Sequence, residues 1–210
     1  GGLLSVTDRD APFIASPERL SAAAIRECGR RGYSGVLLDF EQSPTPDRLA
    51  FAETLARRLA PRPVYVPESY AAASGTVSLV CTAVSGGSFL QYLQGAAAER
   101  AGAGKLALDV QRLRMDFTLP ARSGEGRPLS ASEFQALLDQ ESPSVFFSQD
   151  LCARYFTYTR EGETHFVLFD DADTLQQKLQ TGTRMGFSAA FLMYPEVRDL
   201  LPRLFPARRT

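Results

Sequence analysis

The stretch Gly32-Tyr33-Ser34-Gly35-Val36-Leu37-Leu38-Asp39-Phe40-Glu41 joins an apolar run to two carboxylates. Residues 35–40 predict a buried strand, because apolar side chains dominate the run and a glycine opens it. Side chains of a strand alternate between its two faces, so Leu37, Asp39 and Glu41 point to the same side. The sequence therefore predicts two carboxylates side by side at the carboxyl end of one strand.

Short apolar runs alternate with longer amphipathic segments on both sides of this stretch. The expected strands cover residues 3–7, 35–40, 64–66, 77–84, 105–110 and 187–193, and the expected helices cover 17–28, 45–59, 89–100, 131–139 and 170–185. Such alternation is typical of an α/β protein with a largely parallel sheet. Two further β-prone runs, 155–160 and 165–169, flank Glu161-Gly162-Glu163, which predicts a hairpin.

Length and charge limit the classes of protein that fit. The chain has 210 residues, of which 44% are hydrophobic, so we expect a single domain over residues 1–210 with one sizeable core. A formal net charge of -1 provides no long-range attraction to nucleic acid or to an anionic membrane, so we expect no nucleic-acid partner. No run approaches the roughly 20 apolar residues of a membrane span.

The sequence has too few cysteine and histidine residues for most metal sites and for most forms of nucleophilic catalysis. Cys28, Cys81 and Cys152 lie far apart, and His165 is the only histidine in the sequence. This composition argues against zinc ligation and against Ser-His or Cys-His catalysis. We therefore expect no metal and no cofactor.

The two carboxylates at the end of residues 35–41 have two interpretations. In a (β/α) barrel the active site is built at the carboxyl ends of the strands, and two adjacent carboxylates push one pKa upward, which suits a general acid. Alternatively, Asp39 and Glu41 cap the following loop and helix. The spacing alone leaves both interpretations open.

The stretch resembles the DGxDxDxE signature of glycoside hydrolase family 18, which contains chitinases and peptidoglycan N-acetylglucosaminidases. The resemblance implies that Glu41 is the proton donor and that Asp39 orients the N-acetyl group of the substrate. In this family the acetamido oxygen of the substrate itself attacks the anomeric carbon.

Three later segments are similar to the spore-cortex-lytic branch of the same family. Residues 105–120 resemble its KIVLGxPxYGYDWTLP segment, residues 155–172 its SPYFxY...HxVWFEDA hairpin, and residues 173–179 its last helix. These matches occur in the family's order along nearly the whole chain. They imply an incomplete TIM-type (β/α) barrel that starts at the family's third strand and carries a small α+β insertion at about residues 145–169.

The resemblance also implies residues that line the glycan cleft. Asp116 and Phe117 lie near the end of the 105–120 segment, and Met193 stands where the family has a sugar-stacking tryptophan. Tyr194 and Tyr65 are tyrosines that could reach the acetamido group. We therefore predict Asp116, Phe117, Met193 and Tyr194 as substrate-binding residues beside the catalytic pair.

Several positions depart from the family pattern. Ser34 and Leu37 replace the first two aspartates of the signature, residues 81–84 replace the MxYD segment, and Leu113-Arg114 replaces a Tyr-Gly pair. Each lost electrostatic contact of this kind can cost about 10²-fold to 10³-fold in rate. Two hypotheses follow: a glycosidase acting on N-acetylglucosamine-containing glycan of the chitin or peptidoglycan type, and a catalytically inactive carbohydrate-binding or scaffold relative.

Assembly and location are weakly constrained. An incomplete barrel leaves an open sheet edge that has to be covered, and a second copy of the chain would cover it in a homo-oligomer. The opening Gly1-Gly2 suits a processed end. With a removed leader we expect the cell envelope or secretion, and otherwise the cytoplasm.

Overall fold

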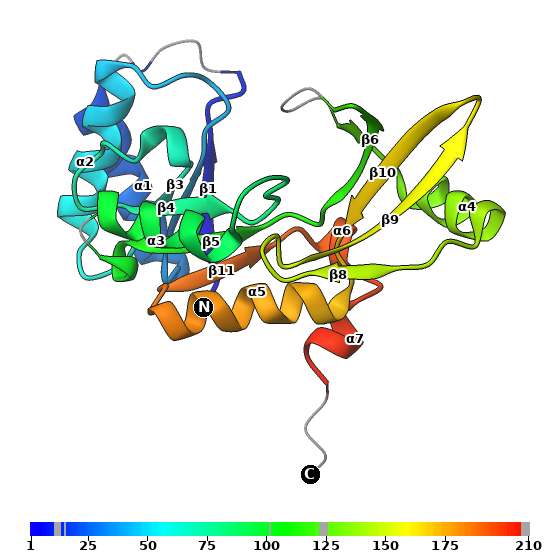
Figure 1. The fold of residues 1–210 in the computed structure, drawn as a ribbon. Coiled ribbons are helices and arrows are strands. Elements are labelled where there is room, and N and C mark those ends of the chain that lie inside the picture. Colours follow the sequence, from blue (N-terminus) through cyan, green and yellow to red (C-terminus); the bar gives the residue numbers. More distant parts are fainter. Residues whose placement is uncertain (11–13, 15, 101, 122–125, 207–210) are drawn as a thin grey trace. The chain divides into compact units, whose positions relative to one another are not determined.

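Six strands form a curled parallel sheet in the computed structural model, which describes residues 1–10, 14, 16–100, 102–121 and 126–206 (Figure 1). The spatial order is β1-β2-β3-β4-β5-β11, with β1 Leu3–Thr7, β2 Gly35–Asp39, β3 Val64–Val66, β4 Val77–Cys81, β5 Leu106–Val110 and β11 Ala189–Leu192. β1, β2, β3 and β4 pair in parallel in chain order. A complete barrel of this kind has eight strands, so the prediction of an α/β protein with a partial barrel is confirmed.

The chain separates into two compact units. The first comprises Gly1–Val80, Ala96–Leu108 and Gly186–Ala189, and the second comprises Cys81–Gly95, Asp109–Met185 and Ala190–Thr210. Each unit is described by itself below. A single domain over residues 1–210 therefore stays a prediction.

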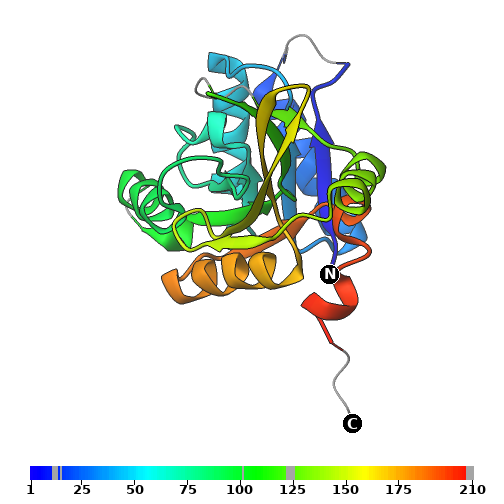
Figure 2. The same cartoon turned by 45° about the vertical axis from the view of Figure 1, so that its right-hand side comes forward.

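Helices α1 Pro17–Arg31 and α2 Pro46–Leu59 lie side by side in both views (Figure 1 and Figure 2). Each begins as expected, because the hydroxyls of Ser16 and Thr45 accept hydrogen bonds from the third residue beyond and a proline follows. Gly32, with φ of 68°, ends α1 in the left-handed region. These helices share a buried core with the sheet, whose largest side chains include Leu38, Phe40, Phe51, Leu55 and Tyr70.

The second unit contains an antiparallel sheet of order β7-β6-β10-β9-β8. Its strands are β6 Arg114–Leu119, β7 Arg127–Pro128, β8 Phe146–Ser148, β9 Ala153–Arg160 and β10 Glu163–Phe169. β9 and β10 form the predicted hairpin around Glu161 and Gly162, whose positive φ values of 53° and 84° suit a two-residue turn. The sheet begins at Arg114 and so extends beyond residues 145–169, because polar and apolar residues also alternate along β6.

The two faces of this antiparallel sheet are both packed. Helix α4 Ala131–Glu141 covers one face, where Leu137 joins Phe156, Val167 and Phe169. On the other face a row of aromatic rings runs across four strands, from Phe117 through Phe166 and Tyr155 to Phe146, with centroids 6.3, 5.2 and 5.6 Å apart. Adjacent rings therefore pack against one another across the sheet.

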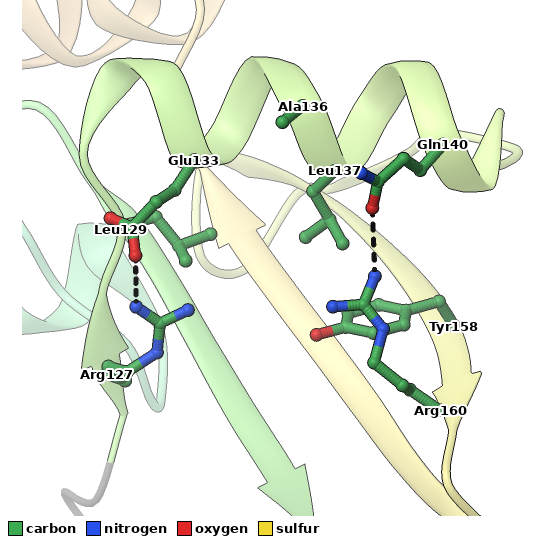
Figure 3. Close-up of a pocket in the computed structure, with 8 residues that line it drawn as sticks. All are labelled: Arg127, Leu129, Glu133, Ala136, Leu137, Gln140, Tyr158 and Arg160. Carbon is green, nitrogen blue, oxygen red and sulfur yellow. Dashed lines mark hydrogen bonds and ion pairs between the residues drawn. The ribbon is translucent and has the colours of Figure 1, made fainter.

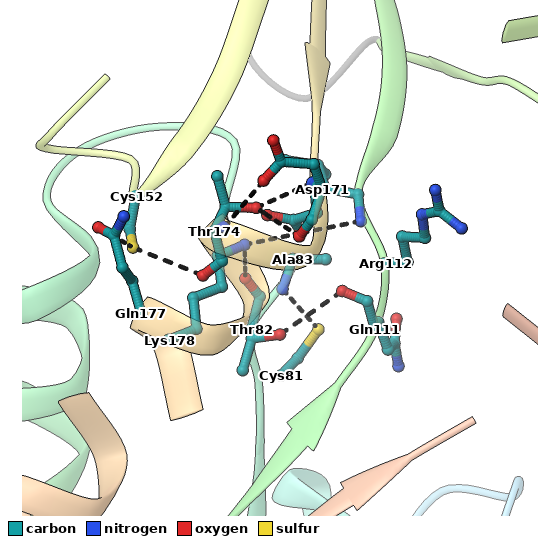
Figure 4. Close-up of polar contacts among 12 residues, drawn as sticks. Cys81, Thr82, Ala83, Gln111, Arg112, Cys152, Asp171, Thr174, Gln177 and Lys178 are labelled. Atoms are coloured by element: carbon teal, nitrogen blue, oxygen red, sulfur yellow. Dashed lines mark hydrogen bonds and ion pairs between the residues drawn. The ribbon is translucent and has the colours of Figure 1, made fainter. Parts of the chain in front are cut away.

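A buried ion pair lies where β10 ends and helix α5 Ala172–Met185 begins (Figure 4). The Lys178 Nζ is 2.8 Å from Asp170 Oδ2 and donates to the carbonyl oxygen of Thr82 at 3.0 Å. The Thr174 hydroxyl and the Leu113 amide also donate to Asp170, at 2.9 and 3.0 Å. Asp171 accepts from the Thr174 amide and caps α5 as expected, whereas Asp170 serves the ion pair.

The remaining helical segments of the described residues contain 3 to 11 residues. They are η1 Glu68–Tyr70, α3 Phe89–Glu99, η2 Ala103–Lys105, α6 Tyr194–Val197 and α7 Leu201–Leu204. Within the described part of the chain, no helix is both long and apolar enough to cross a membrane.

Candidate functional site

The carboxyl ends of β1 and β2 bring the predicted catalytic pair to the edge of the parallel sheet. β2 ends at Asp39, which is exposed, and Glu41 follows two residues later with a side chain that is 52% exposed. Phe40 between them is buried in the core. Asp39, the last residue of β2, and Glu41, two residues beyond the strand, are thus both exposed near the carboxyl end of β2, and the charges of both act on Arg9.

A buried aspartate holds the backbone at Glu41. Asp8, directly after β1, accepts a hydrogen bond from the Glu41 amide at 2.8 Å through Oδ1. Its other oxygen, Oδ2, accepts from Arg48 Nε at 3.0 Å, and both side chains of this ion pair are buried. Gln42 closes the arrangement, because it donates to the Asp8 carbonyl and accepts from Arg48 Nη2. Asp8 thus positions the loop that carries the expected acid.

The sequence contains a signal for the position of Asp8. Asp8 follows the first expected strand directly, and the carboxyl ends of parallel strands meet at one edge of a sheet. Arg48 lies inside an amphipathic helix and gave no comparable signal.

Glu41 is not free in this structure, because Arg9 binds its side chain. Arg9 Nη2 and Nε donate to Glu41 Oε1 at 2.6 and 3.2 Å. The hydrogen bond and the charge of Glu41 raise the pKa of Arg9, and the charge of Asp39 adds to the effect. An arginine bonded in this way binds a carboxylate, whereas a general acid has to carry a proton.

Tyr65 lies one strand away from the predicted pair. It pairs in register with Leu37, so its side chain points to the same face of the sheet as Leu37 and Asp39. Tyr65 is buried, and burial raises the pKa of its hydroxyl. Its contact with an acetamido group stays a prediction.

The other predicted site residues belong to the second unit. Asp116 is buried, where it accepts a hydrogen bond from the Tyr158 hydroxyl at 2.9 Å and lies 3.1 Å from His165 Nδ1. Burial and the hydrogen bond to Asp116 raise the pKa of Tyr158 to about 12. The rings of Tyr158 and His165 stack with centroids 4.5 Å apart, so the single histidine serves this cluster.

Phe117, Met193 and Tyr194 have different surroundings. Phe117 is buried on the opposite face of β6 from Asp116, against Phe166. Met193 and Tyr194 are exposed at the start of α6. A role in glycan binding stays a prediction for these three side chains and for Asp116.

A pocket of about 230 Å³ lies between α4 and the antiparallel sheet, beside Tyr158 (Figure 3). Arg127 is paired with Glu133 at 2.7 Å on one side of it. Arg160 lies over the Tyr158 ring, 5.3 Å from its centroid, and donates to Gln140 at 3.3 Å. Both arginines therefore already have partners, and the sequence gave no indication of this pocket.

Among the described residues, no group of three or more histidine, cysteine, aspartate or glutamate side chains has a geometry that could hold a metal ion.

Comparison with solved structures shows the fold to which the chain is similar. The protein ydhD of Bacillus subtilis matches with a TM-score of 0.64 and 16% identity, over 90% of this chain and 78% of that one. The spore cortex-lytic enzyme SleL of Bacillus cereus matches with a TM-score of 0.60 and 18% identity, over 97% of this chain and 59% of SleL. A chitinase from Chromobacterium violaceum matches with a TM-score of 0.60 and 17% identity, over 95% and 77% of the two chains.

A further solved structure belongs to the same group of glycan-degrading enzymes. A family 18 chitinase from Cycas revoluta, in complex with allosamidin, also matches over 90% of this chain with a TM-score of 0.60 and 16% identity. No protein-family model and no curated protein sequence matches the chain. The chain therefore has a glycoside hydrolase-like fold, shared with chitinases and spore cortex-lytic enzymes.

Proposed function

We propose that this chain is a glycoside hydrolase-like protein that acts on N-acetylglucosamine-containing glycan of the chitin or peptidoglycan type. The observation that carries the proposal is the position of Glu41, exposed beside Asp39 at the carboxyl end of β2. The solved relatives with this fold include chitinases and cortex-lytic enzymes, which supports the same substrate class here.

In the proposed reaction Glu41 is the general acid. It donates its proton to the glycosidic oxygen while the acetamido oxygen of the substrate attacks the anomeric carbon, and the bond to the leaving sugar breaks. Water then opens the cyclic intermediate and returns a proton to Glu41. Asp39 orients the acetamido group, and it does so without a carboxylate at Leu37.

A second candidate function is glycan binding without turnover. The ion pair between Arg9 and Glu41 favours it, because Arg9 occupies the oxygen at 2.6 Å and bonds the deprotonated form. The apolar side chain of Leu37 also removes a carboxylate that the family signature has. In this alternative the two acidic side chains recognise sugar hydroxyl groups.

The deciding experiment compares the wild type with Glu41→Gln on a fluorogenic chitobioside and on purified peptidoglycan. We expect turnover by the wild type and a loss of about 10²-fold or more in the variant, because glutamine cannot donate the proton. Glu99→Gln is the matched control, since Glu99 is an exposed glutamate at the end of α3.

Circular dichroism verifies that all three proteins are folded. Equal turnover by the wild type and Glu41→Gln would contradict the catalytic proposal. Absent turnover, together with binding of chitooligosaccharide that Glu41→Gln weakens, would establish the second candidate.

A further inference from the structure

A second pocket, of about 330 Å³, lies within the second unit and is lined by three arginines. Arg112 and Arg114 come from the chain that leads into β6, and Arg198 follows α6. Glu196 and Asp199 provide the only carboxylates among the residues that line this pocket. Its volume falls at the lower end of the roughly 300–1,000 Å³ that small-molecule sites occupy.

Arg112 uses both of these carboxylates. Its Nη1 donates to the two oxygens of Asp199 at 2.8 and 3.0 Å and to the Glu196 carbonyl at 3.0 Å. The Arg112 amide donates to the Glu196 carboxylate at 3.2 Å. The Arg112 side chain is only 11% exposed, so its role is structural: it attaches α6 to the segment that precedes β6. It still leaves its Nε buried without an acceptor in the described part of the chain.

The other two arginines have no such partner. Within the described residues, the side chains of Arg114 and Arg198 make no hydrogen bond and no ion pair, although both line the pocket. Arg114 is half-buried, and burial together with the nearby charge of Arg112 lowers the pKa of its guanidinium. The carboxylates of Glu196 and Asp199 act on Arg114 in the opposite direction, but both are hydrogen-bonded to Arg112 and offset the lowered pKa only in part. A bound anion would add the negative charge that Arg114 and Arg198 do not receive from a hydrogen-bonded partner among the described residues.

An apolar wall completes the pocket. Phe134 of α4 and Pro195 of α6 both line it, beside the guanidinium groups. A ligand that fits these residues has an oxyanion that contacts the arginines and an apolar group that contacts Phe134 and Pro195. A guanidinium presents parallel N–H donors in a fixed fork, which matches a carboxylate or a phosphate.

We infer that this pocket binds the carboxylate or phosphate group of a small organic ligand through Arg114 and Arg198. Arg112 has a structural role, because it holds Glu196 and Asp199 in place at the side of the pocket. None of the residues predicted for the glycosidase site lines this pocket.

The test measures binding of benzoate and of phenyl phosphate to the full chain, with benzyl alcohol as the neutral analogue. Isothermal titration calorimetry provides the dissociation constants, and ¹⁵N resonances of the arginine Nε groups locate the ligand. We expect at least one of the two anions to bind and to shift the Nε resonance of Arg114. Benzyl alcohol should bind at least about tenfold more weakly, because it carries no charge. The preferred anion identifies carboxylate or phosphate as the natural group.

Two variants make the test specific. Arg114→Gln and Arg198→Gln should each weaken anion binding about tenfold or more, whereas Arg57→Gln, at an exposed arginine of α2, should leave it unchanged. If Arg114→Gln fails to fold, the exposed Arg198 carries the test. The inference is overturned if neither anion binds at millimolar concentration, if benzyl alcohol binds equally well, or if neither variant weakens binding.

Discussion

The contact between Arg9 and Glu41 determines what the carboxylate at the end of β2 can do. The two side chains are 69% and 52% exposed, so water screens their ion pair and it contributes little to folding. The ion pair matters more for the proposed chemistry. A carboxyl group has to be protonated to act as a general acid, whereas an ion pair with arginine requires the carboxylate. If Glu41 is the acid of the proposed reaction, Arg9 competes with its protonation through Oε1, the oxygen that accepts both hydrogen bonds from Arg9.

We therefore expect Arg9→Gln to raise the rate of chitobioside hydrolysis several-fold over the wild type. The variant removes the competing donor and leaves the Asp8 hydrogen bond to the Glu41 amide in place. Initial rates measure the effect, with Arg57→Gln as the control. A tenfold loss of activity would contradict this expectation and would indicate that Arg9 contacts the substrate.

At the scale of a single element, helix α4 depends on its first turn. The Ser130 hydroxyl accepts from the Glu133 amide, and the Glu133 carboxylate accepts from the Ser130 amide, which forms a capping box. Hydrogen bonding of the Glu133 carboxylate with Ser130, followed by its hydrogen bond with Arg127, lowers the pKa of Glu133 from 4.5 to about 2. The ionised form of Glu133 is therefore the form that the folded helix prefers.

This preference has a direction in pH. A carboxyl group with a lowered pKa in the folded state contributes stability above its unfolded pKa of 4.5, and that stability is lost as the pH falls toward about 2. We expect Glu133→Gln, which keeps the cap but does not titrate, to lose less stability than the wild type between about pH 5 and pH 3. Urea unfolding at both values measures the difference. Identical pH dependence in the two proteins would show that the box does not titrate.

At the scale of the whole molecule, the buried pair of Lys178 and Asp170 connects four segments of the second unit. Asp170 at the end of β10 contacts α5 through Lys178 and Thr174, and it also contacts the Leu113 amide. Lys178 extends the network to the Thr82 carbonyl. Burial raises the pKa of Asp170, and the charge of Lys178 opposes this shift. Neither charge can be removed alone without leaving the other buried and unpaired.

Lys178→Met should therefore destabilise the protein by about 3–5 kcal/mol, whereas Lys178→Met combined with Asp170→Asn should cost much less. Denaturant unfolding of both singles and the double variant, taken as a double-mutant cycle, measures the coupling. The deficit of Lys178→Met should shrink as the pH falls, because protonation neutralises Asp170. A double variant as unstable as the sum of the two singles would exclude this coupling.

The sequence by itself determined the order and the type of most elements. Caps at Ser16 and Thr45, the apolar run before Asp39 and the turn at Glu161-Gly162 act within a few residues, so local propensity places them correctly. Both Asp39 and Glu41 are exposed, but Glu41 lies two residues beyond β2, so a shared face for the two carboxylates stays a prediction. Strand β6 is a difference from the expectation, because the resemblance of residues 105–120 to a family segment does not specify a strand there. Polar and apolar residues alternate along Arg114–Leu119, which is the local signal for it.

Only the tertiary structure decided which distant residues meet. Asp8 contacts Arg48 from 40 positions away, Asp116 contacts Tyr158 from 42, and Arg112 contacts Asp199 from 87. Hydrophobic periodicity specifies which face of an element is buried, and it does not specify which polar side chains then lie at bonding distance. The pairing of Glu41 with Arg9, and the placement of Arg114 and Arg198 without a hydrogen-bonded partner among the described residues, result from that packing. Neither arrangement exists before the sheets and helices have packed around their cores.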